Sequence, residues 1–450
     1  MRSARYAYTL ALVRLFLLIL PAVLPARFSE INGARIWILV AGFSIQPAEF
    51  AKILLTIFAA AYLVTKRDVL SLAGRRVLGI DLPRGRDFGP LLLAWLICLA
   101  VLIRGHDLGT SLLFFGVFVV LLYVATERIS WVIVGTLLFA GGAYLSYQLF
   151  ANVRTRVSVW LDVFHYTDGV GYQVSQSLFG LGTGGMFGTG LGVGHPEIVP
   201  LPATDFILTS FGEELGLFGL VALLVIYVLF VERGFAAGLA VRDTFGKLLA
   251  TGLSFLIGLQ LFVVAAGVSR LLPETGLTTP FLSYGGSSLL ANYALLALLL
   301  RISDAARRPS PQRPVTSTPP PRPAEVVSGM NKHIRRVAIA VGVLMVALFL
   351  NLNFVQVVKG DDYRNNSANR RVILTEYASP RGQIVVDGKA VAESVATTDE
   401  LKHVRKYPSG PVYAPLTGYY SLVYDKRRAG ESRGPGAVRE RSPHVRVSHR

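Results

Sequence analysis

The chain has 450 residues, of which 52 % are hydrophobic and only 16 % are charged. This balance excludes an ordinary soluble globular domain and is typical of a protein that crosses a membrane several times. The net charge of +17 comes mainly from basic residues between the apolar segments, so it indicates membrane topology rather than a surface for nucleic acid.

Nine apolar segments are long enough, together with their flanks, to cross a membrane as helices. They are residues 7–25, 45–64, 90–103, 108–125, 131–149, 206–231, 248–268, 286–300 and 335–357. The connections after the second and the eighth segment are rich in Lys and Arg, which keeps short loops in the cytoplasm. With a cytoplasmic N-terminus and no cleavable signal peptide, nine alternating spans place four segments and everything after about residue 358 on the outer face. These outer segments are 26–44, 104–107, 150–205 and 269–285.

The predicted fold is an all-α bundle of membrane helices, followed by a further anchor helix and a small extracytoplasmic segment that contains β-structure. A Pro-rich cytoplasmic linker, 309–329, separates the eight-span module 1–308 from the anchor 330–358. Residues 359–428 are polar with short β-type runs such as GQIVVDG. The tail 429–450 is basic and poor in large apolar residues, so it is predicted to be disordered.

Charged and hydroxyl side chains gather where several segments reach the outer face. They include Asp205, Asp107, Arg35, Ser287 and the pair Glu49 and Lys52, which fall three residues apart on one helix face behind Pro47. Ionisable groups in membrane spans indicate a functional site. Each also has a structural interpretation, since Asp205 or Asp107 could cap a helix, and Glu49 with Lys52 could be an ion pair that closes a packing gap.

Glu213 and Glu214 lie farther along the same predicted span as Asp205, and we interpret both as structural, one of them paired with a basic residue of a neighbouring helix. The loop 180–194 contains a G-x-G-x-x-G pattern, but no strand precedes it, which excludes a dinucleotide site. No Ser-x-x-Lys motif and no metal-ligand spacing of His or Cys is present.

The ordered motifs QPAEFAK, HDLGTS, GYQVSQSLFGLGTGG, TDFILTSFGEELG and SYGGSS resemble those of the SEDS family of bacterial cell-wall proteins, the RodA and FtsW group. The resemblance covers residues 1–308 and begins at the family's third helix, so the family's first two helices are expected to be missing. It implies a ten-helix fold that polymerises lipid II into the glycan strands of peptidoglycan.

Residues 330–428 resemble the start of a class B penicillin-binding protein of the actinobacterial PbpA type, with a membrane anchor and the opening of a pedestal domain. The tail after Arg428 matches nothing in that family, and a shifted reading frame is one explanation. Proteins of the two families work as partners, so the expected partners are lipid II, a class B penicillin-binding protein and membrane lipids, with no nucleic acid.

By this resemblance Asp205 is the catalytic aspartate, the general base for a sugar hydroxyl. The implied substrate-binding residues are Arg35, Glu49, Lys52, Asp107, Arg156, Gln176 and Ser287. The departing pyrophosphate needs positive charge from Arg, Lys or a divalent cation such as Mg²⁺, and no metal ligand is assigned. Two alternatives stay open: a flippase or transporter for the lipid-linked precursor, and an inactive assembly scaffold.

Overall fold

The computed structural model describes residues 13, 16–21, 23–30, 35–40, 42–71, 75–77, 80–82, 108–308, 324–398 and 401–417. The chain divides into two compact units, Met1–Asn366 and Ser367–Arg450. Of the nine predicted spans, the one at 90–103 lies outside the described residues and the one at 7–25 lies partly outside them. Seven helices among the described residues are long and apolar enough to cross a membrane, so the predicted class of fold is confirmed.

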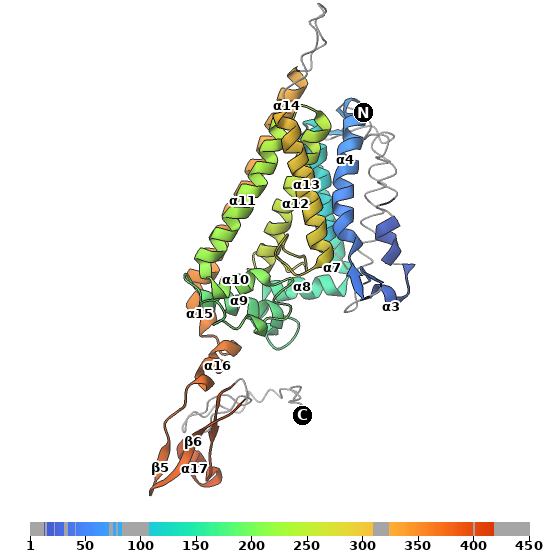
Figure 1. Cartoon of the computed structure of the whole chain (residues 1–450). Helices are drawn as coiled ribbons and strands as arrows, with labels where there is room; N and C mark the ends of the chain where they lie inside the picture. Colours follow the sequence, from blue (N-terminus) through green and yellow to red (C-terminus); the bar gives the residue numbers. More distant parts are fainter. Residues whose placement is uncertain are drawn as a thin grey trace, which may run out of the picture. The chain divides into compact units, whose positions relative to one another are not determined.

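The first unit is a bundle of long helices (Figure 1). Its helices are α3 (Ala26–Ser29), α4 (Pro47–Ser71), α6 (Leu108–Thr126), α7 (Ser130–Leu149), α8 (Ala151–Leu161), α9 (Tyr172–Gly184), α10 (Ile207–Glu214), α11 (Gly216–Ala240), α12 (Thr244–Val268), α13 (Gly286–Arg307), α14 (Ala324–Asn353) and α15 (Gly360–Arg364). Shorter elements are the 3₁₀ turns η1 (Val163–Tyr166) and η2 (Pro196–Ile198), the π turn η3 (Phe354–Val358), and the antiparallel pairs β1 (Ile38–Val40) with β2 (Phe43–Ile45) and β3 (Arg75–Val77) with β4 (Ile80–Leu82).

Helix α12 is the centre of this bundle. In α12, 89 % of the apolar span is buried, whereas in α7 only 6 % is buried. Helix α7 therefore lies at the periphery of the described bundle. Asp243 caps α12 by accepting a hydrogen bond from the backbone N–H of Gly246 at 2.7 Å. Helices α4, α6, α11, α13 and α14 all contact α12, and α8, α9 and α10 gather at one end of the bundle (Figure 1).

The predicted span at 206–231 is wrong, because the apolar run breaks into α10 and α11 at Gly216. Gly216 has a φ of +67°, and a Cβ at this position would lie 2.3 Å from the backbone nitrogen of Gly188. The glycine-rich loop packs directly against this junction, which only a residue without a side chain allows. The membrane-crossing helix therefore begins at Gly216, and Asp205 precedes a short helix of eight residues rather than the outer end of a span.

The second unit contains α16 (Arg370–Ala378), the strands β5 (Ile384–Val386), β6 (Lys389–Ala396) and β7 (His403–Lys406), and α17 (Gly410–Thr417). The three strands form an antiparallel sheet in the order β5-β6-β7. Val391 and Ala392 of the central strand are buried. The β-structure predicted for this segment is therefore present.

The predicted anchor, now α14, packs against α6, α11 and α12 within the first unit. Its buried side chains recur every three or four residues, which forms one stripe along the helix. They are Met330, Ile334, Val337, Val341, Met345, Leu348 and Leu352. These contacts show that the helix is docked against the bundle rather than isolated from it. Among the small residues of this helix, Ala338 packs against the core, whereas Ala340, Gly342 and Ala347 are exposed.

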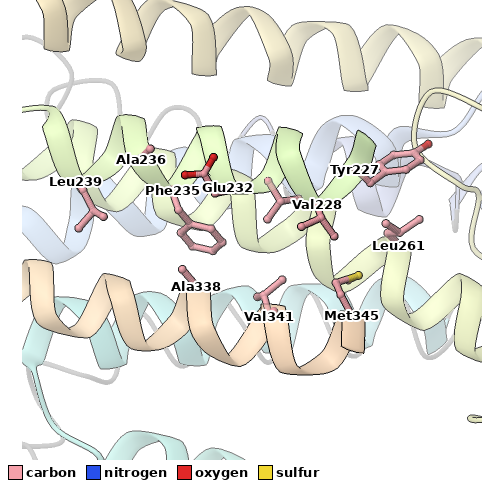
Figure 2. Close-up of a pocket in the computed structure, with 12 residues that line it drawn as sticks. Tyr227, Val228, Glu232, Phe235, Ala236, Leu239, Leu261, Ala338, Val341 and Met345 are labelled. Atoms are coloured by element: carbon pink, nitrogen blue, oxygen red, sulfur yellow. The ribbon is translucent and has the colours of Figure 1, made fainter. Parts of the chain in front are cut away.

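A close contact in this interface is made by a glycine of the other helix. A Cβ on Gly258 of α12 would lie 2.9 Å from Cγ1 of Val341. Gly342, in contrast, borders a cavity of about 260 Å³ between α11, α12 and α14, and no atom lies within 4 Å of the position its Cβ would take. Figure 2 shows this cavity between the Tyr227–Leu239 face of α11 and the Ala338, Val341 and Met345 face of α14.

Three polar side chains tie α14 to the bundle along its length. At the end predicted to be cytoplasmic, Lys247 donates a hydrogen bond to Asn331 at 2.7 Å. Near the outer end Asn351 donates to the hydroxyl of Ser269 at 2.9 Å. The π turn that follows presents buried Gln356 to the carbonyl of Gly212 at 3.1 Å.

Replacing Gly258 with leucine is expected to weaken the docking of α14 by about 1–3 kcal/mol, because the added side chain overpacks against Val341. A protease site placed in the Pro-rich segment 309–323 allows the two fragments to be separated after cleavage. Copurification of the C-terminal fragment then measures the association. The matched control is Gly342→Leu, which has room in the cavity and should retain the fragment. Equal retention in both variants would contradict the packing described here.

The predicted orientation of the bundle across the membrane can be tested by cysteine labelling. In a Cys98→Ala background, an impermeant thiol reagent applied to intact cells should label a cysteine at residue 168 and spare one at residue 75. The reason is the cluster of basic residues in 65–89, which holds that segment in the cytoplasm. The reverse pattern of labelling would mean that the membrane orientation is inverted.

Candidate functional site

Asp205 lies in a turn held in place by its neighbours. The backbone N–H of Tyr284 donates to the carbonyl of Ala203 at 2.8 Å, and the hydroxyl of Ser283 donates to the carbonyl of Thr204 at 2.5 Å. These bonds attach the turn to the connection between α12 and α13. Helix α10 begins after Phe206 as its N-cap residue, so Asp205 does not occupy the capping position that the sequence allowed.

Three charged side chains from different segments converge at Gly276. A Cβ on this glycine would lie 3.7 Å from Oε1 of Glu274, 3.8 Å from Nη2 of Arg156 and 4.0 Å from Oδ2 of Asp205. Gly276 has a φ of +70°, which favours glycine, and it is exposed. Because it has no side chain, its backbone borders the three charged groups directly. Two acids and a guanidinium thus share one water-accessible corner outside the membrane-spanning helices.

The guanidinium of Arg156 is held by this corner. Its Nη1 donates a hydrogen bond to the backbone carbonyl of Glu274 at 3.1 Å, while the side-chain Oε1 of Glu274 accepts from the backbone N–H of Gly276. Partial burial and the nearby Glu274 carboxylate raise the pKa of Asp205 to about 6, and Arg156 opposes this shift. Asp205 is therefore mostly ionised at neutral pH but more basic than an ordinary aspartate.

A small cavity of about 60 Å³ adjoins the cluster, lined by Arg156, Glu274, Arg270 and Trp160 among others. Arg270 has a φ of +59°, in the left-handed region. Its guanidinium donates to the carbonyls of Trp160 at 2.9 Å and Leu161 at 2.6 Å. The larger cavity, beside α14, is apolar in its lining and lies on different elements, so the smaller cavity is the one that belongs to this site.

Glu49 and Lys52 form a buried ion pair of 2.6 Å between Oε2 and Nζ. Lys52 also donates to Oε1 of Gln260 at 2.9 Å, and Gln260 in turn donates to the carbonyl of Thr278 at 2.7 Å. The hydroxyl of Thr278 lies 2.9 Å from that of Ser288. A chain of buried polar groups therefore runs from α4 to the connection that carries Glu274 and Gly276.

The other predicted site residues are placed apart from the cluster. Ser287 accepts from the backbone N–H of Gln46 at 3.0 Å and donates to the carbonyl of Ser44 at 3.3 Å, which joins α13 to β2. Gln176 is buried in α9. Arg35 is exposed and paired with Glu30 at 3.0 Å. Asp107 lies outside the described residues. The structure thus brings together Asp205 and Arg156, with Glu49 and Lys52 connected to them indirectly.

Glu213 and Glu214 serve the glycine-rich loop. Glu213 accepts a hydrogen bond from the backbone N–H of His195 at 2.9 Å, and Glu214 accepts from that of Gly192 at 3.2 Å. Their backbone carbonyls accept further bonds from Thr189 and Gly190. Both glutamates therefore hold the loop against the α10–α11 junction, in keeping with the structural role predicted for them.

Glu274, Gly276 and Gln260 were missed by the sequence reasoning. Glu274 is a lone acid in the outer segment 269–285, and its position in PETG before the motif SYGGSS was the only available signal. Within the described part of the chain, no three His, Cys, Asp or Glu side chains are grouped so that they could hold a metal ion.

A family model described as a cell cycle protein, the FtsW/RodA/SpoVE model, matches residues 1–308. The chain belongs to this family. A second model, the penicillin binding protein A dimerisation domain, matches residues 381–434. The resemblance to both families is thereby confirmed, although the second match continues past residue 428, where the sequence reasoning ended it. As a member of the FtsW/RodA/SpoVE family with several membrane-spanning helices, the protein is a multi-pass protein of the cytoplasmic membrane.

Named members of the FtsW/RodA/SpoVE family are similar over most of the first unit. The chain is 56 % identical over 316 residues to the peptidoglycan glycosyltransferase RodA of Mycobacterium tuberculosis, which covers 70 % of this chain and 67 % of that protein. It is 36 % identical over 308 residues to a probable peptidoglycan glycosyltransferase FtsW of Geobacter sp. strain M18, covering 67 % and 80 % of the two chains. A chain from a solved peptidoglycan synthase complex, described for its coordination of polymerization and crosslinking, aligns with a TM-score of 0.53 at 30 % identity and covers 68 % of this chain and 83 % of that one.

Proposed function

We propose that this protein is a peptidoglycan glycosyltransferase that polymerises lipid II into glycan strands at the outer face of the cytoplasmic membrane. The observation that carries the proposal is the convergence of Asp205, Arg156 and Glu274 at Gly276, outside the membrane-spanning helices. The names of its relatives support the same reaction class. A lipid-linked sugar has its headgroup at this level, since its polyprenyl chain stays in the bilayer.

Asp205 acts as the general base in this proposal. Its carboxylate accepts the proton of the acceptor sugar's 4-hydroxyl while that oxygen attacks the anomeric carbon of the donor. The bond from the anomeric carbon to the pyrophosphate oxygen breaks, and the electron pair leaves with the lipid pyrophosphate. A carboxylate with a pKa of about 6 suits this task, because it is ionised at neutral pH and still basic enough to accept the proton.

Arg156 supplies positive charge for the departing pyrophosphate. A guanidinium offers several N–H donors in a fixed plane, which matches the oxygens of a phosphate. Its hydrogen bond to the carbonyl of Glu274 holds it in position before the substrate arrives. Preorganised charge of this kind stabilises the transition state without a reorganisation cost during the reaction.

A class B penicillin-binding protein is the proposed protein partner. The chain carries its own match to the penicillin binding protein A dimerisation domain, and the similar solved chain comes from a complex that coordinates polymerization with crosslinking. The sequence contains no Ser-x-x-Lys motif for transpeptidation. In this proposal, crosslinking of the new strands is therefore supplied by the partner.

The direct test is incubation of the purified full chain with lipid II in detergent or in lipid nanodiscs, followed by gel separation of the products. A ladder of glycan strands that is digested by a muramidase is the expected result. Unchanged lipid II, in a preparation that remains folded by size-exclusion chromatography, would reject the proposed activity for this chain. Passage of lipid II across vesicle membranes without polymer formation would favour the flippase alternative.

A further inference from the structure

Glu274 is the charged residue of the site that the sequence motifs do not mark. Its Oε1 and the Oδ2 of Asp205 both lie within 4.0 Å of one point, the Cβ position of Gly276. The separation of the two carboxylate oxygens therefore cannot exceed the sum of their distances from this point, 3.7 Å for Glu274 and 4.0 Å for Asp205. Two carboxylates this close, with Arg156 beside both, form one electrostatic unit.

The position of Glu274 is fixed from two sides. Its side chain bends back to accept a hydrogen bond from the N–H of Gly276, and its backbone carbonyl accepts one from Arg156. Two residues beyond Gly276, the carbonyl of Thr278 is held by buried Gln260 at 2.7 Å. The connection that carries Glu274 is thus anchored to the core before any substrate binds.

We infer that Glu274 is a positioning residue of the polymerase site: its side chain holds the 274–276 turn, whose backbone carbonyl holds Arg156, and its negative charge acts on Asp205. This inference rests on the proposed function and adds a residue to it. A like charge nearby disfavours the ionised form of an acid, and Glu274 acts on Asp205 in this direction. The consequence is a stronger general base, because a carboxylate that holds its proton more tightly also accepts one more readily.

The charged groups that act on Asp205 come from two directions. Arg156 faces it from α8, and Glu274 faces it from the connection between α12 and α13. Arg270 belongs to the same connection, but its guanidinium is bonded to the carbonyls of Trp160 and Leu161. Removal of the charge on Glu274 should therefore lower the pKa of Asp205 while Arg156 continues to act on it.

The Glu274→Gln variant separates the charge from the hydrogen bond, because the amide oxygen of glutamine still accepts from the N–H of Gly276. Infrared difference spectra of the full chain, titrated between pH 4 and 8, report the protonated carboxyl of Asp205, which is assigned by its loss in Asp205→Asn. The midpoint in Glu274→Gln should lie about 0.5–1 pH unit below that of the wild type. Glu197→Gln is the matched control, since Glu197 is a 65 % exposed acid of the outer segment, and it should leave the midpoint unchanged.

Polymerisation of lipid II gives the second readout. The acidic limb of the pH–rate profile should move to lower pH in Glu274→Gln, and turnover at pH 7 should fall about twofold to threefold, because only part of the change in basicity appears in the rate. Glu274→Asp keeps the charge and should keep the wild-type limb even where its turnover is reduced. An Asp205 midpoint that is the same in wild type and Glu274→Gln would overturn the inference. Absence of polymer from the wild-type protein would instead reject the proposed function, and the infrared titration would still decide the effect of Glu274.

Discussion

Replacement of Asp205 by asparagine is expected to lower the rate of glycan polymerisation by at least about 10²-fold, because it removes the general base and keeps the shape of the side chain. Asparagine should not disturb the fold, since helix α10 begins after Phe206 and does not depend on Asp205 as its cap. The measurement is the initial rate of lipid II consumption by purified wild-type and variant proteins. Expression and the elution volume on size exclusion should be unchanged.

The acid limb of the wild-type profile provides an independent check on this role. With a pKa of about 6, the carboxylate of Asp205 becomes protonated as the pH falls through 6, so turnover should decline there. An aspartate with its ordinary value of 3.8 would keep turnover constant to a much lower pH. The matched control is Glu197→Gln, which should polymerise at the wild-type rate. Substantial polymerisation by Asp205→Asn would exclude Asp205 as the base.

Replacement of Lys52 by methionine is expected to destabilise the protein by about 3–5 kcal/mol, because it leaves the carboxylate of Glu49 buried without its cation. Lys52 is 2 % exposed and Glu49 is 5 % exposed, so water cannot take the place of the missing partner. The loss should appear as a lower midpoint of thermal unfolding in detergent. The double variant Glu49→Gln with Lys52→Met should recover much of this loss, since neither residue is then charged.

An exposed ion pair in the same unit is the control for this experiment. Arg35 and Glu30 lie 3.0 Å apart, with their side chains 54 % and 35 % exposed, so Arg35→Met should cost less than about 1 kcal/mol. The difference in unfolding midpoint between Lys52→Met and Arg35→Met tests the effect of burial, because each variant removes one positive charge from an ion pair. A midpoint for Lys52→Met no lower than that for Arg35→Met would contradict the buried ion pair.

The site could be predicted in part from sequence, as Asp205, Arg156 and Glu274 show. The resemblance of the sequence motifs to those of the SEDS family named Asp205 and Arg156 in advance. Glu274 could not be named in advance, because its role depends on its contact with Asp205 and Arg156, which lie 69 and 118 positions away in the chain. A single sequence does not show which distant residues come into contact. Lys52 and Gln260 are connected for the same reason, through helices far apart in sequence.

The class of protein and the presence of most of the apolar helices that the structure describes were determined by the sequence alone. Hydropathy and basic loops are local properties, since each residue partitions between lipid and water largely independently of the rest of the fold. The break at Gly216 was not visible, because the apolar run continues through it and only the approach of Gly188 explains it. The contact of Gly258, rather than Gly342, with the neighbouring helix was also not visible in the sequence, since a uniformly apolar helix has no polar face to set its rotation. Contacts between segments distant in the chain decided both, because close packing depends on which surfaces the whole fold brings together.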